Sequence, residues 1–494
     1  MPPPPPPPPP PSFEEQDDWN KRKTEVRETF LRAWTGYKTR AFPDDELSSV
    51  SGGRSNKYNG WGVTVFDSLS TMWIMGLSKE FSEAVTSSQS VPFFETVIRY
   101  LGGSLSAYAL SGNEDMLKFA QRLGDALLPA FKTPSGLPSY GINVGTGEGE
   151  ASGATLFSEA TSCQLEYKYL AKLTGKKEYY DRVQKVEELF YKADPEDGLF
   201  ALTYSRTDGS PASKFLTAGS MADSGYEYFL KQWILTGDVQ ARNQYIKSAN
   251  GIIKNLIYVT PNRGLMYAGD MENKVVSHRF QHLTCYLPGM LMLGVSVLDL
   301  PPEERELHKW AAEGLTYTCY ITYRDQKTDL GPEIISMVPG KNWVELVTEW
   351  KSKGRRGKPP GLSEPAPEKD RSKRDYTNSD SKYMLRPETV ESIFYMWRFT
   401  GDVKWRQRGY EIYRAIEEHT RTEFAYASIG DVDDGSRFMD EMQSFFLAET
   451  LKYLYLLFDD PKNFNLTTWT FNTEAHPLPV FSWTDAEKKA FNIP

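Results

Sequence analysis

Acidic side chains stand at the starts of several aromatic-rich segments of this sequence, at spacings that suit acid–base chemistry. Glu95 and Arg99 are four residues apart. Asp223 and Glu227 repeat that spacing. Residues four apart lie on one face of a helix, so the two members of each pair would point to the same side. Several carboxyl groups facing one space suit glycoside hydrolysis, which needs an acid and a base, and they also suit a hard cation.

Three further segments carry acids in the same setting. Glu388 and Glu391 follow Pro387, a residue favoured at the first position of a helix, and they would share one face. Glu159 lies near the start of FSEATSCQLEYKYL, and Glu449 interrupts the apolar run SFFLAETLKYLYLLF. An acid in the first turn of a helix complements the helix dipole and needs no other role. Glu449 is harder to explain in this way, because burying a carboxylate is costly without a partner or a metal.

The other chemical motifs are weak or missing. His278 and His282 have the four-residue spacing of a helical zinc pair, but SHRFQHLTC lacks the metalloprotease glutamate and no third ligand is recognisable. The sequence contains neither a glycine-rich phosphate loop nor a GxSxG motif. The chain carries 57 Lys and Arg against 66 Asp and Glu, a net charge of −9, which argues against nucleic acid as the main partner.

A repeated pattern predicts the helices that must position the acids. Four aromatic-rich segments with a helical pattern end at a glycine, namely Gly112, Gly175, Gly237 and Gly401. Glycine is the expected residue just past a helix end, and amphipathic text resumes after it. The first three of these glycines are 63 and 62 residues apart, so the unit is a helix hairpin of about 62 residues.

The patterned region, from about Trp19 to about Phe458, holds about seven such hairpins. Long runs of β-alternation are absent, the repeats diverge strongly and no distinct capping repeat is present, which favours a closed ring over an open solenoid. We therefore predict an all-α fold, an (α/α)7 barrel. In a closed barrel, helix ends from different hairpins converge on one mouth, and the acids would gather there. One barrel also replaces the roughly three domains that the length alone suggests.

The two ends of the chain are predicted to lie outside this barrel. Met1 is followed by ten prolines, a stiff polyproline II tract, and we assign residues 1–17 to a disordered linker. This tract is either a spacer below an upstream anchor or a natural disordered start. No segment is long and apolar enough to span a membrane, so a membrane anchor could only lie upstream. The barrel is assigned to residues 18–480 and a C-terminal tail to residues 481–494.

A basic insertion interrupts the barrel. Residues 351–374 carry nine basic and three acidic side chains and very few apolar ones. We predict a mobile surface loop insertion at about 351–380 that buries no core. The three cysteines, Cys163, Cys285 and Cys319, exclude a disulfide-dense scaffold and leave open one bridge with a spare thiol or a fully reduced chain. Nothing in the pattern indicates an oligomeric state.

The sequence resembles glycoside hydrolase family 47, the class I α-1,2-mannosidases that trim N-linked glycans, from about Phe30 to Pro479. The motifs that carry the resemblance are long and occur in order: FLRAWTGYKTRAFPDDEL, VFDSLSTMWIMGL, FFETVIRYLGGSLSAY, ADSGYEYFLKQW, HLTCYLPGML, LRPETVESIFYMWR, SFFLAETLKYLYLLF and FNTEAHPLP. The family folds as an (α/α)7 barrel, inverts the anomeric configuration and depends on Ca²⁺, so the resemblance implies all three here.

The resemblance also implies roles for the acids. Glu95 matches the general acid, acting through a water, and Glu388 matches the base that activates the attacking water. Asp223 matches the third acid of the catalytic set. Thr473 matches the residue that binds Ca²⁺ directly through its carbonyl and hydroxyl, the other ligands being waters and sugar hydroxyls. Positions of the sugar pocket or of the metal's surroundings are matched by Arg99, Glu159, Arg386, Glu391, Phe445, Glu449 and Glu474. An inverting acid and base should stand roughly 6.5–9.5 Å apart to admit the water.

Further implications concern the compartment. Cys285 and Cys319 match the family's disulfide pair, which would leave Cys163 free and buried. A disulfide implies an oxidising compartment, the lumen of the secretory pathway in the endoplasmic reticulum or Golgi, or secretion. The sequon Asn465-Leu466-Thr467 is compatible with this location.

Two positions depart from the members that remove a single mannose. Those members have Arg where this chain has Met221, and Asp where it has Gln281, which puts single-branch specificity in doubt. The leading hypothesis is a hydrolase of high-mannose N-glycans. The alternatives are a glycan-binding quality-control factor on the same fold with weak or no hydrolysis, and a barrel glycosidase for another sugar. The catalytic set and the FNTEAHP motif favour the first hypothesis.

Overall fold

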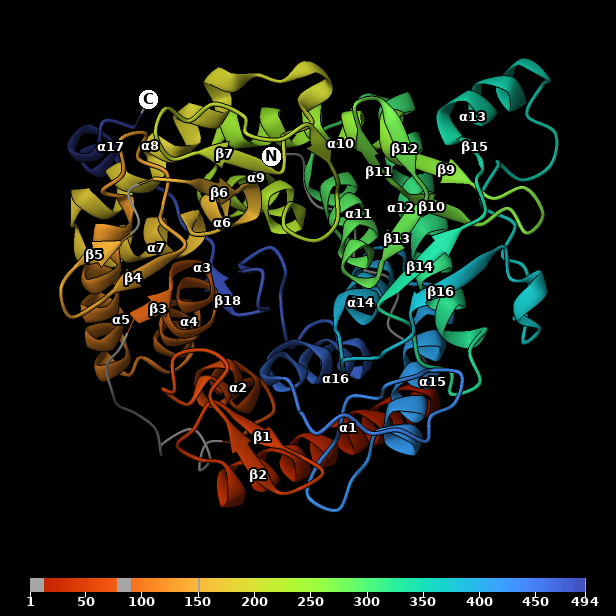
Figure 1. Cartoon of the computed structure of the whole chain (residues 1–494), viewed down its shortest axis with the longest axis horizontal. Helices are drawn as coiled ribbons and strands as arrows, with labels where there is room; N and C mark the ends of the chain where they lie inside the picture. The colour runs from red at the N-terminus through yellow and green to blue at the C-terminus, as the bar shows by residue number, and fades with distance from the viewer. Residues whose placement is uncertain (1–12, 78–89, 150–151, 494) are drawn as a thin grey trace.

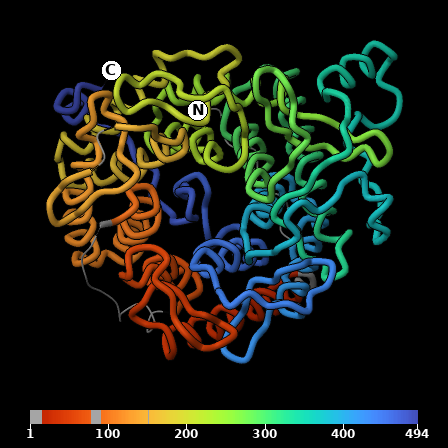
Figure 2. The backbone as a smooth tube through the Cα atoms, in the orientation of Figure 1, coloured from red at the N-terminus to blue at the C-terminus, as the bar shows by residue number. Residues whose placement is uncertain are grey.

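The computed structural model of the chain describes residues 13–77, 90–149 and 152–493. Its helices form two concentric layers around a central axis, and the chain passes once around the ring (Figures 1 and 2). Red α1 lies beside blue α15 and α16, which closes the ring. The longer helices are α1 (Phe13–Arg40), α2 (Val63–Ile74), α4 (Gly102–Ser111), α5 (Glu114–Leu127), α7 (Gln164–Thr174), α8 (Lys177–Ala193), α9 (Asp223–Thr236), α10 (Val239–Leu256), α11 (Leu287–Val297), α12 (Pro302–Arg324), α13 (Trp343–Ser352), α14 (Glu388–Thr400), α15 (Lys404–His419) and α16 (Leu451–Phe458).

Seven of the described helices form the inner ring. They are α2, α4, α7, α9, α11, α14 and α16, each in contact with the next and α16 in contact with α2. Nearly every residue of α9, α14 and α16 is buried, as expected for helices enclosed on all sides. The outer helices, such as α5 and α15, bury one face only. The predicted (α/α)7 barrel is confirmed.

The glycine signals mark the ends of inner helices. Gly112, Gly175, Gly237 and Gly401 follow α4, α7, α9 and α14, each in the left-handed conformation with φ between 68° and 77°. A side chain would strain this conformation, and the backbone N–H of each glycine closes the last turn of its helix. An outer helix begins within a few residues in each case, so these four inner helices all start at the same face of the ring.

Short strands lie in the segments that connect the described helices. None exceeds five residues, and they pair in small antiparallel sheets of two or three. They are β1 (Glu46–Ser48), β2 (Gly53–Ser55), β3 (Ser90–Pro92), β4 (Gly141–Asn143), β5 (Glu148–Gly149), β6 (Ala154–Leu156), β7 (Thr203–Ser205), β8 (Phe215–Leu216), β9 (Ile257–Val259), β10 (Met266–Ala268), β11 (Asp270–Glu272), β12 (Val275–Ser277), β13 (Arg279–Gln281), β14 (Ile334–Met337), β15 (Lys341–Asn342), β16 (Tyr376–Asp380), β17 (Trp469–Phe471) and β18 (Pro477–Pro479). The β17–β18 hairpin enters the ring, where β17 contacts α9 and β18 contacts α4 (Figure 1).

The predicted ends of the barrel need correction. Residues 1–12 lie outside the described residues, but α1 already begins at Phe13, so the linker prediction is wrong for residues 13–17. A hydrogen bond from the side chain of Gln16 to that of Asn20, four residues on, adds support near the start of this helix. The C-terminal tail contains α17 (Asp485–Phe491), which begins with a capping box and packs Phe491 against Trp483.

The basic insertion is also more structured than predicted. Residues 343–352 form α13, and β16 joins a sheet with β14 at the periphery of the ring (Figure 1). Arg374 is fully buried and donates two hydrogen bonds to Asp433, at 2.9 and 3.1 Å. A paired carboxylate offsets the cost of burying a guanidinium, so the segment buries the charged side chain of Arg374 although none of the apolar side chains of residues 351–374 is buried.

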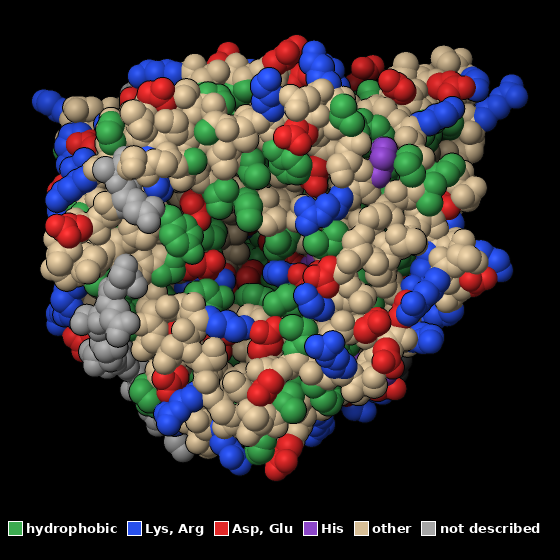
Figure 3. Space-filling model, viewed as in Figure 1, with side chains coloured by type: hydrophobic (Ala, Val, Ile, Leu, Met, Phe, Trp, Pro, Cys, Tyr) green, Lys and Arg blue, Asp and Glu red, His purple; other side chains and the backbone are tan. Residues whose placement is uncertain are grey.

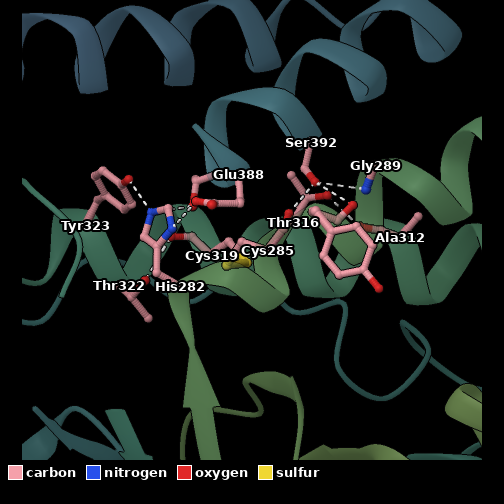
Figure 4. The surroundings of a disulfide bond; sticks show 12 residues. His282, Cys285, Gly289, Ala312, Thr316, Cys319, Thr322, Tyr323, Glu388 and Ser392 are labelled. Carbon is pink, nitrogen blue, oxygen red and sulfur yellow. Dashed lines mark hydrogen bonds and ion pairs between the residues drawn. A yellow bond between two sulfur atoms is a disulfide. The ribbon is translucent and has the colours of Figure 1, made fainter. Parts of the chain in front are cut away.

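Two of the three cysteines are joined to each other. A disulfide joins Cys285, in the short helix η5 (His282–Tyr286), to Cys319 in α12, as the resemblance implied (Figure 4). Cys163 is buried and free. Among the described residues, no helix has the length and apolar character needed to cross a membrane.

Candidate active site

A cavity of about 300 Å³ opens at the mouth of the barrel. Figure 3 shows it as a central hollow with acidic, basic and hydrophobic side chains inside. All eleven residues predicted for catalysis, sugar binding and the metal line it: Glu95, Arg99, Glu159, Asp223, Arg386, Glu388, Glu391, Phe445, Glu449, Thr473 and Glu474. Sequence positions as far apart as 95 and 474 therefore meet in one space.

The inner helices bring these side chains together because they start at the mouth. Asp223 and Glu388 are the first residues of α9 and α14. Glu159 lies in the short helix α6 (Phe157–Thr161), just before α7, and Glu95 ends the short helix α3 (Phe93–Glu95). The positive ends of helix dipoles thus surround the acids and offset part of their mutual repulsion.

Two of the side chains lie on π-helical turns. Arg99 belongs to η2 (Thr96–Leu101) and Glu449 to η7 (Phe446–Thr450). A π-turn inserts an extra residue into a helix and is often found at functional sites. These turns start α4 and α16 with a wider winding, so the cavity-facing residues do not follow the regular helical period.

Glu388 has the environment of a base. His282 Nδ1 lies 2.7 Å from its Oε2, and His282 Nε2 lies 2.6 Å from the hydroxyl of Tyr323 (Figure 4). Arg386 approaches the other carboxylate oxygen at 3.9 Å. Burial by itself would raise the pKa of Glu388, but the hydrogen bond from His282 and the charge of Arg386 outweigh it and hold the pKa below its ordinary value. The carboxylate is therefore ionised at neutral pH and able to accept a proton.

We expect His282→Ala to move the acid limb of the kcat/KM profile to higher pH. The substitution removes the hydrogen bond that lowers the pKa of Glu388, while burial, which raises it, remains. A higher pKa means that a higher pH is needed to ionise the base, so activity at acidic pH falls first. His278→Ala is the matched control, because His278 bonds to Tyr267 and not to the base. An unchanged limb in His282→Ala would contradict this role.

Arg99 joins the acid to the floor of the cavity. Its Nε donates to Glu95 at 2.7 Å, and its Nη1 donates to Asp67 at 3.2 Å and to Glu474. Arg99, Asp67 and Glu474 are buried, whereas the side chain of Glu95 is 31% exposed. Glu95 is thus held in place by a buried cation and still reachable from the mouth.

We expect Arg99→Met to lower the free energy of unfolding by about 3–5 kcal/mol, because it leaves buried carboxylates without their cation. Lys118→Met is the control, since Lys118 pairs with Asp115 on the surface and such pairs contribute about 0–1 kcal/mol. Denaturant unfolding of both variants measures the difference. A loss in Arg99→Met no larger than in the control would contradict the prediction.

Carboxyl groups crowd the deep part of the cavity. Burial and the neighbouring Glu227 raise the pKa of Glu391 to about 8. Burial, with Glu227 and Glu388 nearby, raises the pKa of Asp223 to about 7. Burial and the neighbouring Glu474 and Glu391 raise the pKa of Glu449 well above its ordinary value. A cation bound beside these acids would favour their ionised forms and so oppose the rise in their pKa values.

The donors suit a hard cation such as Ca²⁺, because all of them are oxygens. Among the described residues, however, no three acidic, histidine or cysteine side chains lie close enough together to bind one ion directly. Thr473 lines the cavity beside Glu474, so its oxygens are available to such an ion together with waters bound to the acids.

Three important side chains were missed or underrated by sequence reasoning. Glu227 lines the cavity, although only its spacing from Asp223 was noted. Glu333 accepts hydrogen bonds from Arg386 Nε at 2.8 and 2.7 Å and so orients that guanidinium. His282 was considered only as half of a zinc pair. Nothing in the local text marks Glu333 or His282, because their partners lie 53 and 106 residues away.

A barrel of paired helices with acids gathered at one mouth, one of them kept ionised and another supported by a buried arginine, defines a glycoside hydrolase. The match to a family model agrees: residues 29–480 match the model of glycosyl hydrolase family 47. The chain belongs to this family.

Named relatives are similar over almost the whole chain. The human endoplasmic reticulum mannosyl-oligosaccharide 1,2-alpha-mannosidase is 39% identical over 94% of this chain and 65% of its own length. The mannosyl-oligosaccharide 1,2-alpha-mannosidase MNS1 of Arabidopsis thaliana is 35% identical over 95% of this chain and 80% of its own. The chain thus spans about two thirds of the human relative.

The solved structures agree on the fold. An alpha-1,2-mannosidase from Trichoderma reesei superposes with a TM-score of 0.82 at 29% identity, covering 94% of this chain and 99% of that one. A D-mannose isomerase superposes with a TM-score of 0.54 at 12% identity, which shows only a shared fold.

Proposed function

We propose that this protein is an exo-α-1,2-mannosidase that removes terminal α-1,2-linked mannose from high-mannose N-glycans, with inversion and with dependence on Ca²⁺. The observation that carries the proposal is the pairing of Glu388, kept ionised by His282, with Glu95, supported by Arg99, in one cavity of a family 47 barrel. The names of the relatives supply the sugar and the linkage.

We propose one task for each acid of the cavity. Glu388 takes a proton from the attacking water, because its carboxylate stays ionised. Glu95, more open to the mouth, delivers a proton to the leaving oxygen through a water. Asp223 lies close enough to Glu388 and Glu227 for the charges of both to raise its pKa. Direct attack by water gives a single displacement and therefore inversion.

The remaining residues bind the sugar and exclude water. Phe445 lines the cavity with the guanidinium of Arg386 over its ring at 5.6 Å, which gives the pocket one flat apolar wall. Thr473 would hold Ca²⁺, which would supply positive charge beside the acids and bind sugar hydroxyls. Glu391, Glu449 and Glu474 would hold the waters that complete its surroundings.

The disulfide and the relatives support a place of action. The Cys285–Cys319 bridge is typical of an oxidising compartment, and the human relative is named for the endoplasmic reticulum. We propose the lumen of the secretory pathway, where high-mannose N-glycans on glycoproteins are the partners.

Incubation with a Man9 oligosaccharide tests the function. We expect stepwise loss of α-1,2-linked mannoses, and proton NMR of the first product should show β-mannose, the inverted anomer. The order of products also shows whether Met221, exposed at the rim of the cavity, allows more than one branch. Tight binding of the glycan without release of mannose would instead support a glycan-binding quality-control factor.

A further inference from the structure

The turn that carries Thr473 is held from behind by a buried side chain. Between β17 and β18, the backbone N–H of Asn472 donates to the carbonyl of His476 at 3.0 Å. The side-chain oxygen of Asn472 accepts from the backbone N–H groups of Glu474 and His476, at 3.0 and 2.8 Å. Ala475 completes the turn with φ of 55°. The shape of the turn, and so the direction of Thr473 and Glu474, depends on where Asn472 sits.

Asn472 is in turn placed by Glu166, a buried acid of α7. The amide nitrogen of Asn472 donates to Glu166 Oε1 at 2.8 Å and to the carbonyl of Ile98 at 2.9 Å. The hydroxyl of Tyr228 donates to the same Glu166 oxygen at 2.8 Å and accepts from the backbone N–H of Thr473 at 3.3 Å. Glu166 thus holds the turn at two points, through Asn472 and through Tyr228.

The arrangement costs free energy that packing alone would avoid. Glu166, Asn472 and Tyr228 are all 0% exposed. Within the part of the chain that the structure describes, Glu166 Oε2 has no hydrogen-bond partner, and an unsatisfied buried oxygen costs stability. On the other side, a Cβ on Gly102 would come within 2.5 Å of the Asn472 amide nitrogen, so α4 begins with the residue that leaves room for this amide.

We propose that Glu166 is a positioning residue for the calcium end of the active site: by accepting from Asn472 and Tyr228 it fixes the turn that presents Thr473 and Glu474. This inference rests on the proposed Ca²⁺ dependence. Glu166 does not line the cavity, so it acts through the turn and not on the sugar or the ion.

Calorimetric titration of metal-stripped protein with Ca²⁺ tests the proposal without any assay of activity. Glu166→Met should raise the Kd for Ca²⁺ about 10–100-fold, the usual cost of losing a partner behind a ligand. Glu166→Gln should keep the Kd close to that of the wild type, because its amide oxygen still accepts from both donors. Gly102→Ala, which displaces Asn472 from the opposite side, should weaken Ca²⁺ binding as Glu166→Met does.

Glu187→Met is the matched control. Glu187 is equally buried, on the adjacent helix α8, and the groups that act on its carboxyl are Lys168, Tyr191, Asp238 and Gln232, none of which belongs to the turn. The substitution Glu187→Met should lower Tm and leave the Kd for Ca²⁺ unchanged. A wild-type Kd in Glu166→Met, or an equal weakening in Glu187→Met, would overturn the inference alone. Absence of Ca²⁺ binding by the wild type would overturn it together with the proposed metal dependence.

A second, independent observation concerns the sequon. Asn465 and Thr467 are both exposed in the loop between α16 and β17, and Asn465 Oδ1 accepts from the backbone N–H and hydroxyl of Thr467, each at 2.9 Å. Arg398, in the last turn of α14, holds this loop by donating to the carbonyls of Pro461 and Phe464 at 3.1 and 2.6 Å. The loop therefore lies near the end of α14 that is opposite Glu388, about 15 Å along the helix axis from Glu388 to Arg398.

We infer that Asn465 carries an N-linked glycan, at the face of the barrel remote from the mouth, where it leaves substrate access free. The inference rests on the proposed location in the secretory pathway. Protein secreted from eukaryotic cells should lose mass on digestion with peptide N-glycosidase. Asn465→Gln and Thr467→Ala should abolish this loss of mass and leave kcat unchanged. Asn463→Gln, two residues away, should lose mass on digestion as the wild type does.

The disulfide separates the two ways in which this inference could fail. Secreted protein with an intact Cys285–Cys319 bridge and no glycan would overturn the modification alone. Protein with neither the bridge nor the glycan would overturn the modification together with the proposed compartment.

Discussion

Replacing Glu388 by glutamine is expected to lower kcat by about 10²–10⁴-fold, the usual contribution of a general base. Glutamine has almost the same shape but cannot take a proton from water, while the neighbouring His282 and Arg386 remain in place. Hydrolysis of a Man9 oligosaccharide measures the loss. Binding of the glycan should persist, because the rest of the cavity is intact.

The substitution should also change the acids beside it. Glu388 is one of the charges that raise the pKa values of Asp223 and Glu391. Neutral glutamine removes that repulsion, so both pKa values should fall. Glu187→Gln is the matched control, since Glu187 is buried in the same barrel away from the cavity and its loss should leave kcat unchanged. Undiminished turnover in Glu388→Gln would remove Glu388 from the role of base.

Removal of Ca²⁺ is expected to abolish hydrolysis and to lower Tm. Without the ion, burial and the neighbouring carboxyl groups raise the pKa of Glu391 to about 8 and that of Glu449 well above its ordinary value, so these acids are protonated instead of holding the waters of a cation. At a Ca²⁺ concentration of 100 times Kd, binding stabilises the folded state by about 2.7 kcal/mol. Activity and thermal unfolding in excess EDTA measure both effects, and Ca²⁺ added back should restore both.

Thr473→Val separates the bound ion from a general effect of the chelator. It keeps the backbone carbonyl and loses the hydroxyl, so half-maximal activity should need more Ca²⁺ than in the wild type. Thr468→Val, at an exposed position of the preceding loop, should behave like the wild type. Full activity of the wild type in EDTA, after all metal has been removed, would contradict the dependence.

Much of the fold could be predicted from short stretches of the sequence. The four glycines that end α4, α7, α9 and α14 lie within one residue of helices whose periodicity is visible in the sequence. Helix caps and amphipathic periods act over one or two turns, so they can be read without knowing the rest of the chain. Counting the resulting hairpins was enough to predict a ring of seven.

The candidate site could be predicted in its members but not in its arrangement. The acids at helix starts were visible as residues, and the family motifs added Thr473 and the disulfide pair. The sequence could not show that His282 supports Glu388 or that Arg99 lies on a π-helical turn. Nor could it show that Arg374 is buried, since a basic run is usually exposed and it is the positions of Asp433 and Gln326 that make burial of its guanidinium tolerable.

One physical cause separates the features that could be predicted from the sequence from those that could not. Composition, helix starts and helix ends depend on neighbours within a turn or two, and the sequence by itself determined these: the helix hairpins, the acids at their starts and the membership of the family. Contacts between residues far apart in the chain decide the pKa of each acid and the partner of each buried charge. They also decide the position of the turn that carries Thr473. Only closure of the ring brings those residues within a few ångströms, and so the tertiary structure alone decided them.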